Sequence, residues 1–142
     1  METFIIKSAT SNEVIQKPHF FVLNKGLNSG KPLLQPCANC FKIEAKNEQI
    51  KDHLYWISFA LWRSNAFYPY LIGSVIPYIR IGDYKALICK RLELINAHPD
   101  EFLKVVTQLK LIEQKEKQLL DNIHLIRELK KAFVFSYFNK PR

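Results

Sequence analysis

The chain has 142 residues, of which 48% are hydrophobic, and its formal net charge is +8. A chain of this size and composition can bury one hydrophobic core and carry an extended helical arm, and it does not need the disulfide bridges of small disulfide-rich domains. The excess positive charge favours anionic partners, either nucleic acids or anionic membranes, although ordinary solvated lysines would give the same sum.

The sequence contains neither an apolar run long enough to cross a membrane nor the basic-then-apolar layout of a secretory signal. Near the N-terminus, the apolar residues Phe4–Ile6 are followed at once by Lys7. The cysteine count of three is odd, which fits a reducing compartment better than a disulfide framework. These features predict a cytoplasmic protein without a membrane partner.

Three short β-rich runs in the first part of the chain predict a small sheet: Phe4–Lys7, His19–Leu23 and Phe41–Ala45. Between the second and third runs, residues 24–39 concentrate Gly, Pro and Asn residues, which favour turns. This composition predicts one long loop between the two strands.

This loop is the first candidate for a ligand contact, because long loops inside compact domains usually have a function. Lys25 and Lys31 would contact phosphate oxygens if the ligand is a nucleic acid. The side-chain amides of Asn24, Asn28 and Gln35 are candidates for reading base edges, since an amide can pair with adenine in the major groove. A merely solvated loop is the alternative.

The loop also contains Cys37 and Cys40, which have the spacing of a metal knuckle. A structural zinc site needs four ligands, and the remaining candidates are Cys89 and scattered histidines. Two free thiols are therefore expected, with a small zinc-stabilised domain as the minor alternative. The sequence has no phosphate-binding loop, hydrolase motif or paired catalytic carboxylates. We expect neither an enzyme nor a cofactor.

The segment Asn47–Arg63 predicts a helix, with Asn47 as its N-cap and Glu48 in its first turn. Apolar residues recur in it every three or four positions, as a buried helical face requires: Ile50, Leu54, Ile57 and Leu61. Neighbouring aromatic residues widen this face, so we expect them to be core side chains rather than platforms for nucleobases.

The segment after this helix contains the Gly73–Ser74 turn, whose backbone amides and hydroxyl would suit phosphate contacts. Arg63 and Arg80, which flank this segment, would add positive charge to the same surface. The alternative is that each arginine pairs with an acidic residue such as Asp52 or Asp83.

Two helices are predicted in the C-terminal part, the first from Asp83 to about Ala97 and the second over about residues 99–138. His98–Pro99 separates them, because proline is tolerated at the first position of a helix. The second helix has a heptad seam in which most positions are apolar: Val105, Ile112, Leu119, Ile126 and Phe133 at one position, and Leu109, Glu116, Ile123 and Lys130 at the other.

A helix of this length extends beyond one small domain, since it rises about 1.5 Å per residue. Its seam therefore needs a partner, and an antiparallel homodimer centred near Ile123 would place Glu116 opposite Lys130. The predicted contact residues are Leu109, Ile112, Leu119, Ile123, Ile126 and Phe133. Packing against the preceding helix of the same chain, or docking onto another protein, are the alternatives.

Three short motifs occur in order before the long helix: Ser64–Phe67, Gly73–Pro77, and Asp83 within Gly82–Tyr84. This series resembles the target-recognition domain of type I restriction-modification specificity subunits, in which a Ser-x-x-Phe helix end, a Gly-Ser-x-Ile-Pro turn and an aspartate-started helix precede a long spacer helix. The resemblance implies recognition of double-stranded DNA. It also implies a dimer, since a full subunit has two such domains and this chain has one.

A second resemblance, carried by Lys17–Phe21, is to small bacterial proteins of unknown function and implies no activity. The combined prediction is an α+β (or α/β) fold, with a recognition module at 1–88 and a helical arm at 89–142. The predicted function is DNA binding as half of a specificity subunit that dimerises through its C-terminal helix. The alternative is a protein-interaction adaptor, or an antirestriction-type decoy, that acts through the arm without binding DNA.

Overall fold

The computed structural model describes residues 3–10 and 14–141. The chain divides into two compact units, Met1–Ala97 and His98–Arg142. The first unit combines a small antiparallel sheet with two helices, and the second is one long helix, so the fold is α+β as predicted.

The sheet has four strands, β1 (Phe4–Ser8), β2 (His19–Leu23), β3 (Pro32–Leu33) and β4 (Cys40–Ala45). Their order is β1-β4-β2-β3, and all neighbouring strands are antiparallel. The three strands expected from the sequence are confirmed to within one residue at each end.

Strand β3 was not expected, because the sequence predicted a continuous loop over residues 24–39. Gly26 and Gly30 have φ values of +89° and +94°, in the left-handed region that glycine adopts readily. They close a turn that returns the chain to β2, where Val22 pairs with Pro32. Proline is acceptable there because β3 is an edge strand.

Helix α1 (Glu48–Arg63) begins as predicted, since the Asn47 side chain accepts a hydrogen bond from the Ile50 amide at 2.9 Å. The helix ends where Asn65 takes a left-handed conformation with φ +57°. The Ala66 amide then donates to the Leu61 carbonyl at 2.9 Å, as in a Schellman motif. The Ser64–Phe67 stretch is therefore the C-terminal cap of α1.

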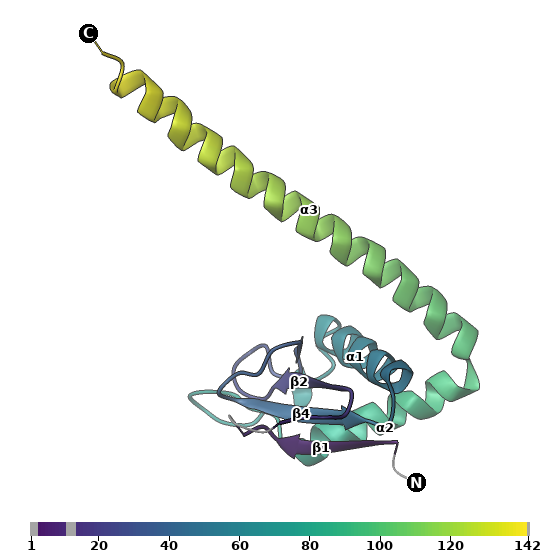
Figure 1. Ribbon diagram of the computed structural model, residues 1–142. Helices are drawn as coiled ribbons and strands as arrows, with labels where there is room; N and C mark the ends of the chain where they lie inside the picture. The colour runs from purple at the N-terminus through teal and green to yellow at the C-terminus, as the bar shows by residue number, and fades with distance from the viewer. Residues whose placement is uncertain (1–2, 11–13, 142) are drawn as a thin grey trace. The chain divides into compact units, whose positions relative to one another are not determined.

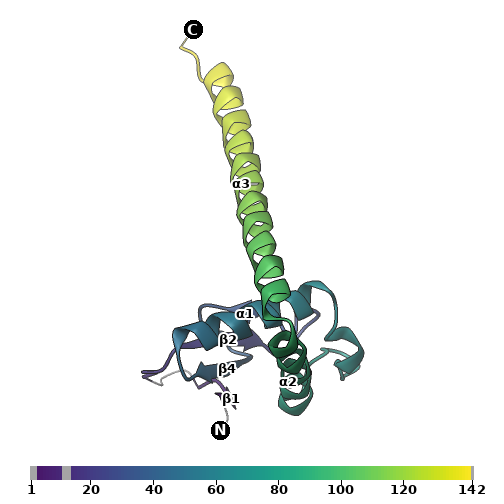
Figure 2. The same cartoon turned by 90° about the vertical axis from the view of Figure 1, so that its right-hand side faces the viewer.

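Both helices of the first unit pack against the same face of the sheet (Figures 1 and 2). Phe20 of β2 contacts Tyr55 of α1, and Phe41 of β4 contacts Tyr84 of α2 (Ile81–Ala97). The buried hydroxyl of Tyr84 shares a hydrogen bond with Ser58 of α1. Burial raises the pKa of this phenol well above its ordinary value, so it remains neutral in the folded protein.

Helix α2 starts at Ile81, two residues before the predicted start at Asp83, and ends at Ala97 as predicted. Its Tyr84 and Ile88 are buried, each with about 1% of the side chain exposed. Because α2 contacts α1 and β1, it belongs to the first unit. The division therefore falls after Ala97, whereas the predicted module ended at residue 88.

Gly30 of the β2–β3 turn must be glycine because of packing as well as backbone geometry. A Cβ atom on Gly30 would lie 2.1 Å from the ring of Phe67, so only glycine fits there. Phe67 in turn stacks on Tyr84 with 5.4 Å between ring centroids. Through Phe67, the β2–β3 turn and helix α2 both pack against the residues that follow α1.

The second unit consists of α3 (Pro99–Phe138), which agrees with the predicted range of about 99–138. Pro99 occupies its first turn together with Asp100 and Glu101, which suits the positive end of the helix dipole. In the described part of the chain, no helix is both long enough and apolar enough to cross a membrane.

Candidate nucleic-acid interface

Two loops that are far apart in the sequence are joined at one end of the first unit. The Gly26 amide donates to the Pro77 carbonyl at 2.7 Å, and the Ile79 amide donates to the Asn24 carbonyl at 3.0 Å. Lys25 and Tyr78 form an isolated β-bridge between these contacts. We call residues 24–31, 62–63 and 72–80 the paired-loop end, which lies beside the left-hand ends of the strands in Figure 1.

The second loop is a tight turn closed by reciprocal hydrogen bonds between Ile72 and Tyr78, with N–O distances of 2.9 and 2.8 Å. Gly73 has φ +106°, and a Cβ atom there would lie 2.7 Å from the Ile76 carbonyl oxygen. The glycine is therefore required by the turn itself. Ser74 is exposed at the tip, where its hydroxyl is accessible to a ligand.

Two of the predicted DNA-contacting side chains meet on one aromatic ring at this end. The Lys31 ammonium lies 5.1 Å from the centre of the Trp62 ring, and the Arg63 guanidinium lies 4.5 Å from it. Both distances are within the range of cation–π attraction. Sequence reasoning placed Trp62 in the core, but it is half-buried and supports two cations at the surface.

Trp62 ends a row of aromatic rings along α1 in which neighbours contact edge to face. The centroid distances along this row are between 5.2 and 5.7 Å, and its members are Tyr55, Trp56, Phe59 and Trp62. Only Phe59 is fully buried, so the expectation that these rings belong to the core holds for Phe59 and only in part for the others.

Arg80 forms the ion pair that was the alternative to ligand binding. Its Nε donates to a carboxylate oxygen of Asp83 at 2.6 Å, which raises the pKa of the guanidinium. The Arg80 side chain remains 63% exposed, and surface ion pairs of this kind exchange readily with other anions because solvent screens them.

The two asparagines of the first loop have different environments. The side-chain amide oxygen of Asn24, Oδ1, is buried and has no hydrogen-bond partner among the described residues. A bidentate contact with adenine requires an accessible amide, so the predicted base-reading role of Asn24 does not fit this position. Asn28 is exposed in the same turn and retains that role as a prediction.

The charge of the first unit is unevenly distributed along the sequence. The segments 24–40 and 62–84 contain Lys25, Lys31, Arg63 and Arg80 but only one acidic residue, Asp83. By contrast, residues 41–61 contain three lysines and three acids, which balance. The paired-loop end lies within the first two segments and therefore carries an excess of positive charge.

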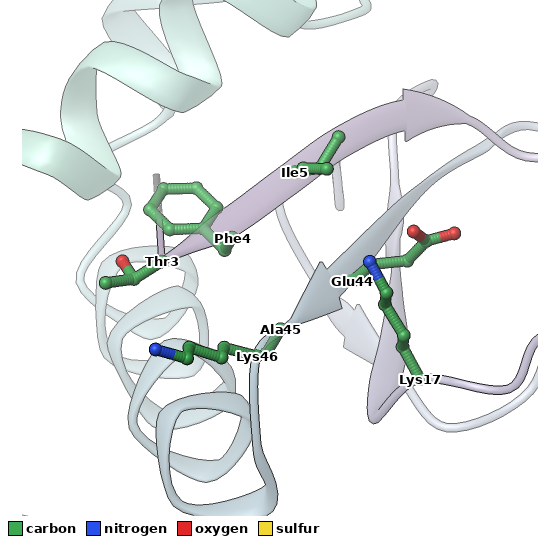
Figure 3. Close-up of a pocket in the computed structure, with 7 residues that line it drawn as sticks. All are labelled: Thr3, Phe4, Ile5, Lys17, Glu44, Ala45 and Lys46. Carbon is green, nitrogen blue, oxygen red and sulfur yellow. The ribbon is translucent and has the colours of Figure 1, made fainter. Parts of the chain in front are cut away.

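A second group of lysines lies on the sheet face that is turned away from α1 and α2. Lys42 is almost fully buried and donates to Glu44 at 2.8 Å. This hydrogen bond holds the pKa of the Glu44 carboxyl below its ordinary value, and the charges of Lys7 and Lys17 act in the same direction. The Lys17 ammonium points towards the Glu44 carboxylate at one side of a shallow pocket of about 190 Å³ (Figure 3).

The pair of Lys42 and Glu44 was not predicted from the sequence. The pattern that could have indicated it is a lysine between two apolar strand residues, Phe41 and Ile43. Because Lys42 and Glu44 neutralise each other at close range, we interpret the pair as a structural ion pair of the sheet.

The Cys-x-x-Cys segment forms a turn before β4. The Cys40 thiol donates to the Cys37 carbonyl at 3.0 Å and accepts from the Cys37 amide at 3.3 Å. Burial raises the pKa of the Cys40 thiol, which opposes formation of the thiolate that a metal would bind. Within residues 3–10 and 14–141, no three His, Cys, Asp or Glu side chains gather as metal ligands.

The predicted seam of α3 is largely exposed in the single chain. The exposed fraction of its side chains is between 45% at Ile123 and 74% at Phe133, and Leu109 is less exposed. The same range covers the other seam residues: Val105, Ile112, Leu119 and Ile126. Soluble proteins rarely leave so many large apolar side chains uncovered on one helix, so this surface suits a partner.

Comparison with known proteins identifies a family but no described activity. No curated protein and no solved structure matches the chain. A model of a family of unknown function, DUF6943, matches residues 6–136, so the chain belongs to that family.

Proposed function

We propose that this chain binds double-stranded DNA through the paired-loop end and joins a second copy through the seam of α3. One observation carries the first half of the proposal: two loops and the end of α1 gather four cationic side chains, of which Arg80 pairs with Asp83 of α2. Phosphate groups along a duplex attract such a surface and release counterions when it binds.

The cations would act as phosphate contacts that orient the protein rather than as readers of sequence. Lys31 and Arg63 are held on the Trp62 ring, so they lose less side-chain freedom on binding than lysine and arginine in open solvent. Lys25 and the Ser74 hydroxyl extend the same surface across both loops. Asn28, exposed between them, is the proposed reader of base edges.

The order of elements in the structure supports the resemblance to half of a type I specificity subunit. The Ser64–Phe67 stretch caps α1, the Gly73–Pro77 motif is the turn of the paired-loop end, and Asp83 lies in the first turn of α2. The long α3 follows, as the spacer helix does in that family. Under this proposal, two copies supply the two recognition domains of a complete subunit.

The experiment measures affinity for labelled mixed-sequence duplex DNA by fluorescence anisotropy at low salt. We expect Lys31→Gln combined with Arg63→Gln to lower affinity about tenfold or more and to reduce the salt dependence by about two counterions. The matched control is Lys7→Gln combined with Lys46→Gln, which removes the same charge from exposed residues of β1 and of the β4–α1 turn.

If the two double variants lose affinity equally, the protein binds DNA only through its total charge, and the assignment to the paired-loop end is wrong. If the wild-type protein does not bind at low salt, the proposal of DNA binding fails altogether.

A second candidate function, that of a protein-interaction adaptor, rests on the exposed apolar side chains of α3. An adaptor would use this helix to pair with a helix of a different protein. In that case the purified chain would remain monomeric and would not bind DNA, whereas the first proposal requires both self-association and DNA binding. Sedimentation of the purified chain separates the two candidates.

A further inference from the structure

The C-terminal turns of α3 expose aromatic side chains on the side of the helix opposite the seam. With Leu119, Ile126 and Phe133 at one seam position and Ile123 and Tyr137 at the other, Phe135 and Phe138 occupy the heptad positions that point away from a partner helix. Lys131 is at the same heptad position as Phe138, and Val134 flanks both. We call Lys131, Val134, Phe135 and Phe138 the outer aromatic face.

The apolar members of this face are well exposed, with fractions of 52% at Val134, 69% at Phe135 and 76% at Phe138. They lie on ordered helix, since α3 continues unbroken to Phe138 (Figure 1). Asn139 then caps the helix by donating through its backbone and side-chain amides to the Phe135 carbonyl, at 3.1 and 2.9 Å. Helix geometry separates Phe135 and Phe138 from the centre of the seam by more than a quarter turn, so pairing along the seam would leave these two rings uncovered.

The charged residues of the last part of the chain are all basic. From Lys130 to the C-terminus the sequence contains Lys130, Lys131, Lys140 and Arg142 and no acidic residue. The nearest upstream acid, Glu128, pairs with Lys131 at 2.8 Å, but both side chains are exposed and such a pair is weak. Large aromatic side chains among cations suit a surface that is apolar beneath and anionic on top.

We infer that the outer aromatic face binds the surface of an anionic membrane, with α3 lying along the interface at its C-terminal end. Phenylalanine rings enter the boundary between headgroups and acyl chains, and lysines contact the anionic headgroups. A DNA duplex would satisfy the lysines, but its outer surface offers phosphates rather than apolar area to the rings. This inference does not depend on the proposed DNA binding.

The test is co-sedimentation of the full chain with phosphatidylcholine vesicles, with and without about one third phosphatidylserine. We expect binding to the anionic vesicles, weakened by salt, and little binding to the neutral ones. Phe135→Ser combined with Phe138→Ser should lower partitioning about tenfold or more, because two rings leave the interface.

The matched control is Leu103→Ser combined with Leu111→Ser, which removes two exposed apolar side chains of the same helix that lie outside both the seam and the outer aromatic face. We expect this control to bind vesicles within about twofold of the wild type, and circular dichroism verifies that both variants stay helical. If the wild type does not bind anionic vesicles, the inference is wrong, and the outer aromatic face would instead bind in a groove of another protein. An equal loss in both double variants also overturns it.

Discussion

The two units of this chain differ in the burial of their large apolar side chains. In the first unit, Phe20, Phe67 and Tyr84 are essentially inaccessible, in a core between the sheet and two helices. In the second, the large apolar side chains of α3 are mostly exposed along its length. The difference indicates that the first unit is stabilised by its own core, whereas the apolar side chains of the second suit burial against another molecule.

The largest expected effect concerns the exposed apolar side chains of α3. Leu119→Ser combined with Ile126→Ser removes two seam side chains from each copy, and so four from a dimer, each of which would contribute about 2 kcal/mol when buried. Self-association should weaken by about 8 kcal/mol, roughly a millionfold, so sedimentation should show only monomer at concentrations where the wild type is a dimer. The unfolding of the first unit should stay unchanged.

Leu111→Ser combined with Leu125→Ser is the control, because these leucines are equally exposed but lie outside the seam. If the control dissociates the protein as strongly as the seam variant, or if the wild type is already monomeric, the seam is not a homodimer interface.

The next largest effect tests the self-contained core of the first unit. Gly30→Ala should lower the free energy of unfolding by about 3 kcal/mol, because its Cβ would overlap Phe67 in a left-handed backbone conformation. Gly26→Ala has a similar φ but meets no atom within 4 Å, so its cost should be only about 1 kcal/mol. Urea unfolding of both variants checks the difference, and equal losses would mean that packing on Phe67 is not what fixes Gly30.

A smaller effect concerns the outer face of the sheet. Lys42→Met should cost about 2 kcal/mol near neutral pH, because it leaves the largely buried Glu44 carboxylate without its hydrogen-bond donor. Lys42 lowers the folded-state pKa of Glu44, so the stability from this pair is present above the unfolded pKa of about 4.3 and is lost as pH falls through the folded value.

The difference between the wild type and Lys42→Met should therefore shrink as the pH is lowered below about 4, in urea titrations at several pH values. The exposed Lys46→Met variant should show no such pH dependence. A loss in Lys42→Met that is the same at every pH would indicate that the lysine acts through packing rather than through its charge.

Periodic sequence signals predicted most elements well, and signals that depend on distant residues did not. Strands β1, β2 and β4, the Asn47 cap, the break at His98–Pro99 and the extent of α3 all follow from local patterns. Strand β3 did not, because Pro32 and Leu33 become a strand only by pairing with β2. The position of α2 in the first unit depends likewise on burial of Tyr84 and Ile88, which the local sequence does not reveal.

The candidate interface was predictable residue by residue but not as an assembly. Lys25, Lys31, Arg63 and the Gly73–Ser74 turn were chosen for their chemistry, and the hydrogen bonds between the loops bring them to one end of the unit. Trp62 was expected in the core, because helical spacing does not show that it lies beside Lys31. The burial of the Asn24 side-chain oxygen Oδ1 likewise follows from tertiary contacts rather than from turn composition.

The most direct test of DNA binding is the slope of log affinity against log salt concentration for the wild-type protein and a mixed-sequence duplex. With four cations at the paired-loop end, we predict a slope of about −3 to −4 per copy of the chain. A slope near zero, or no binding at low salt, would contradict the account and leave the helical arm as the functional part of the chain.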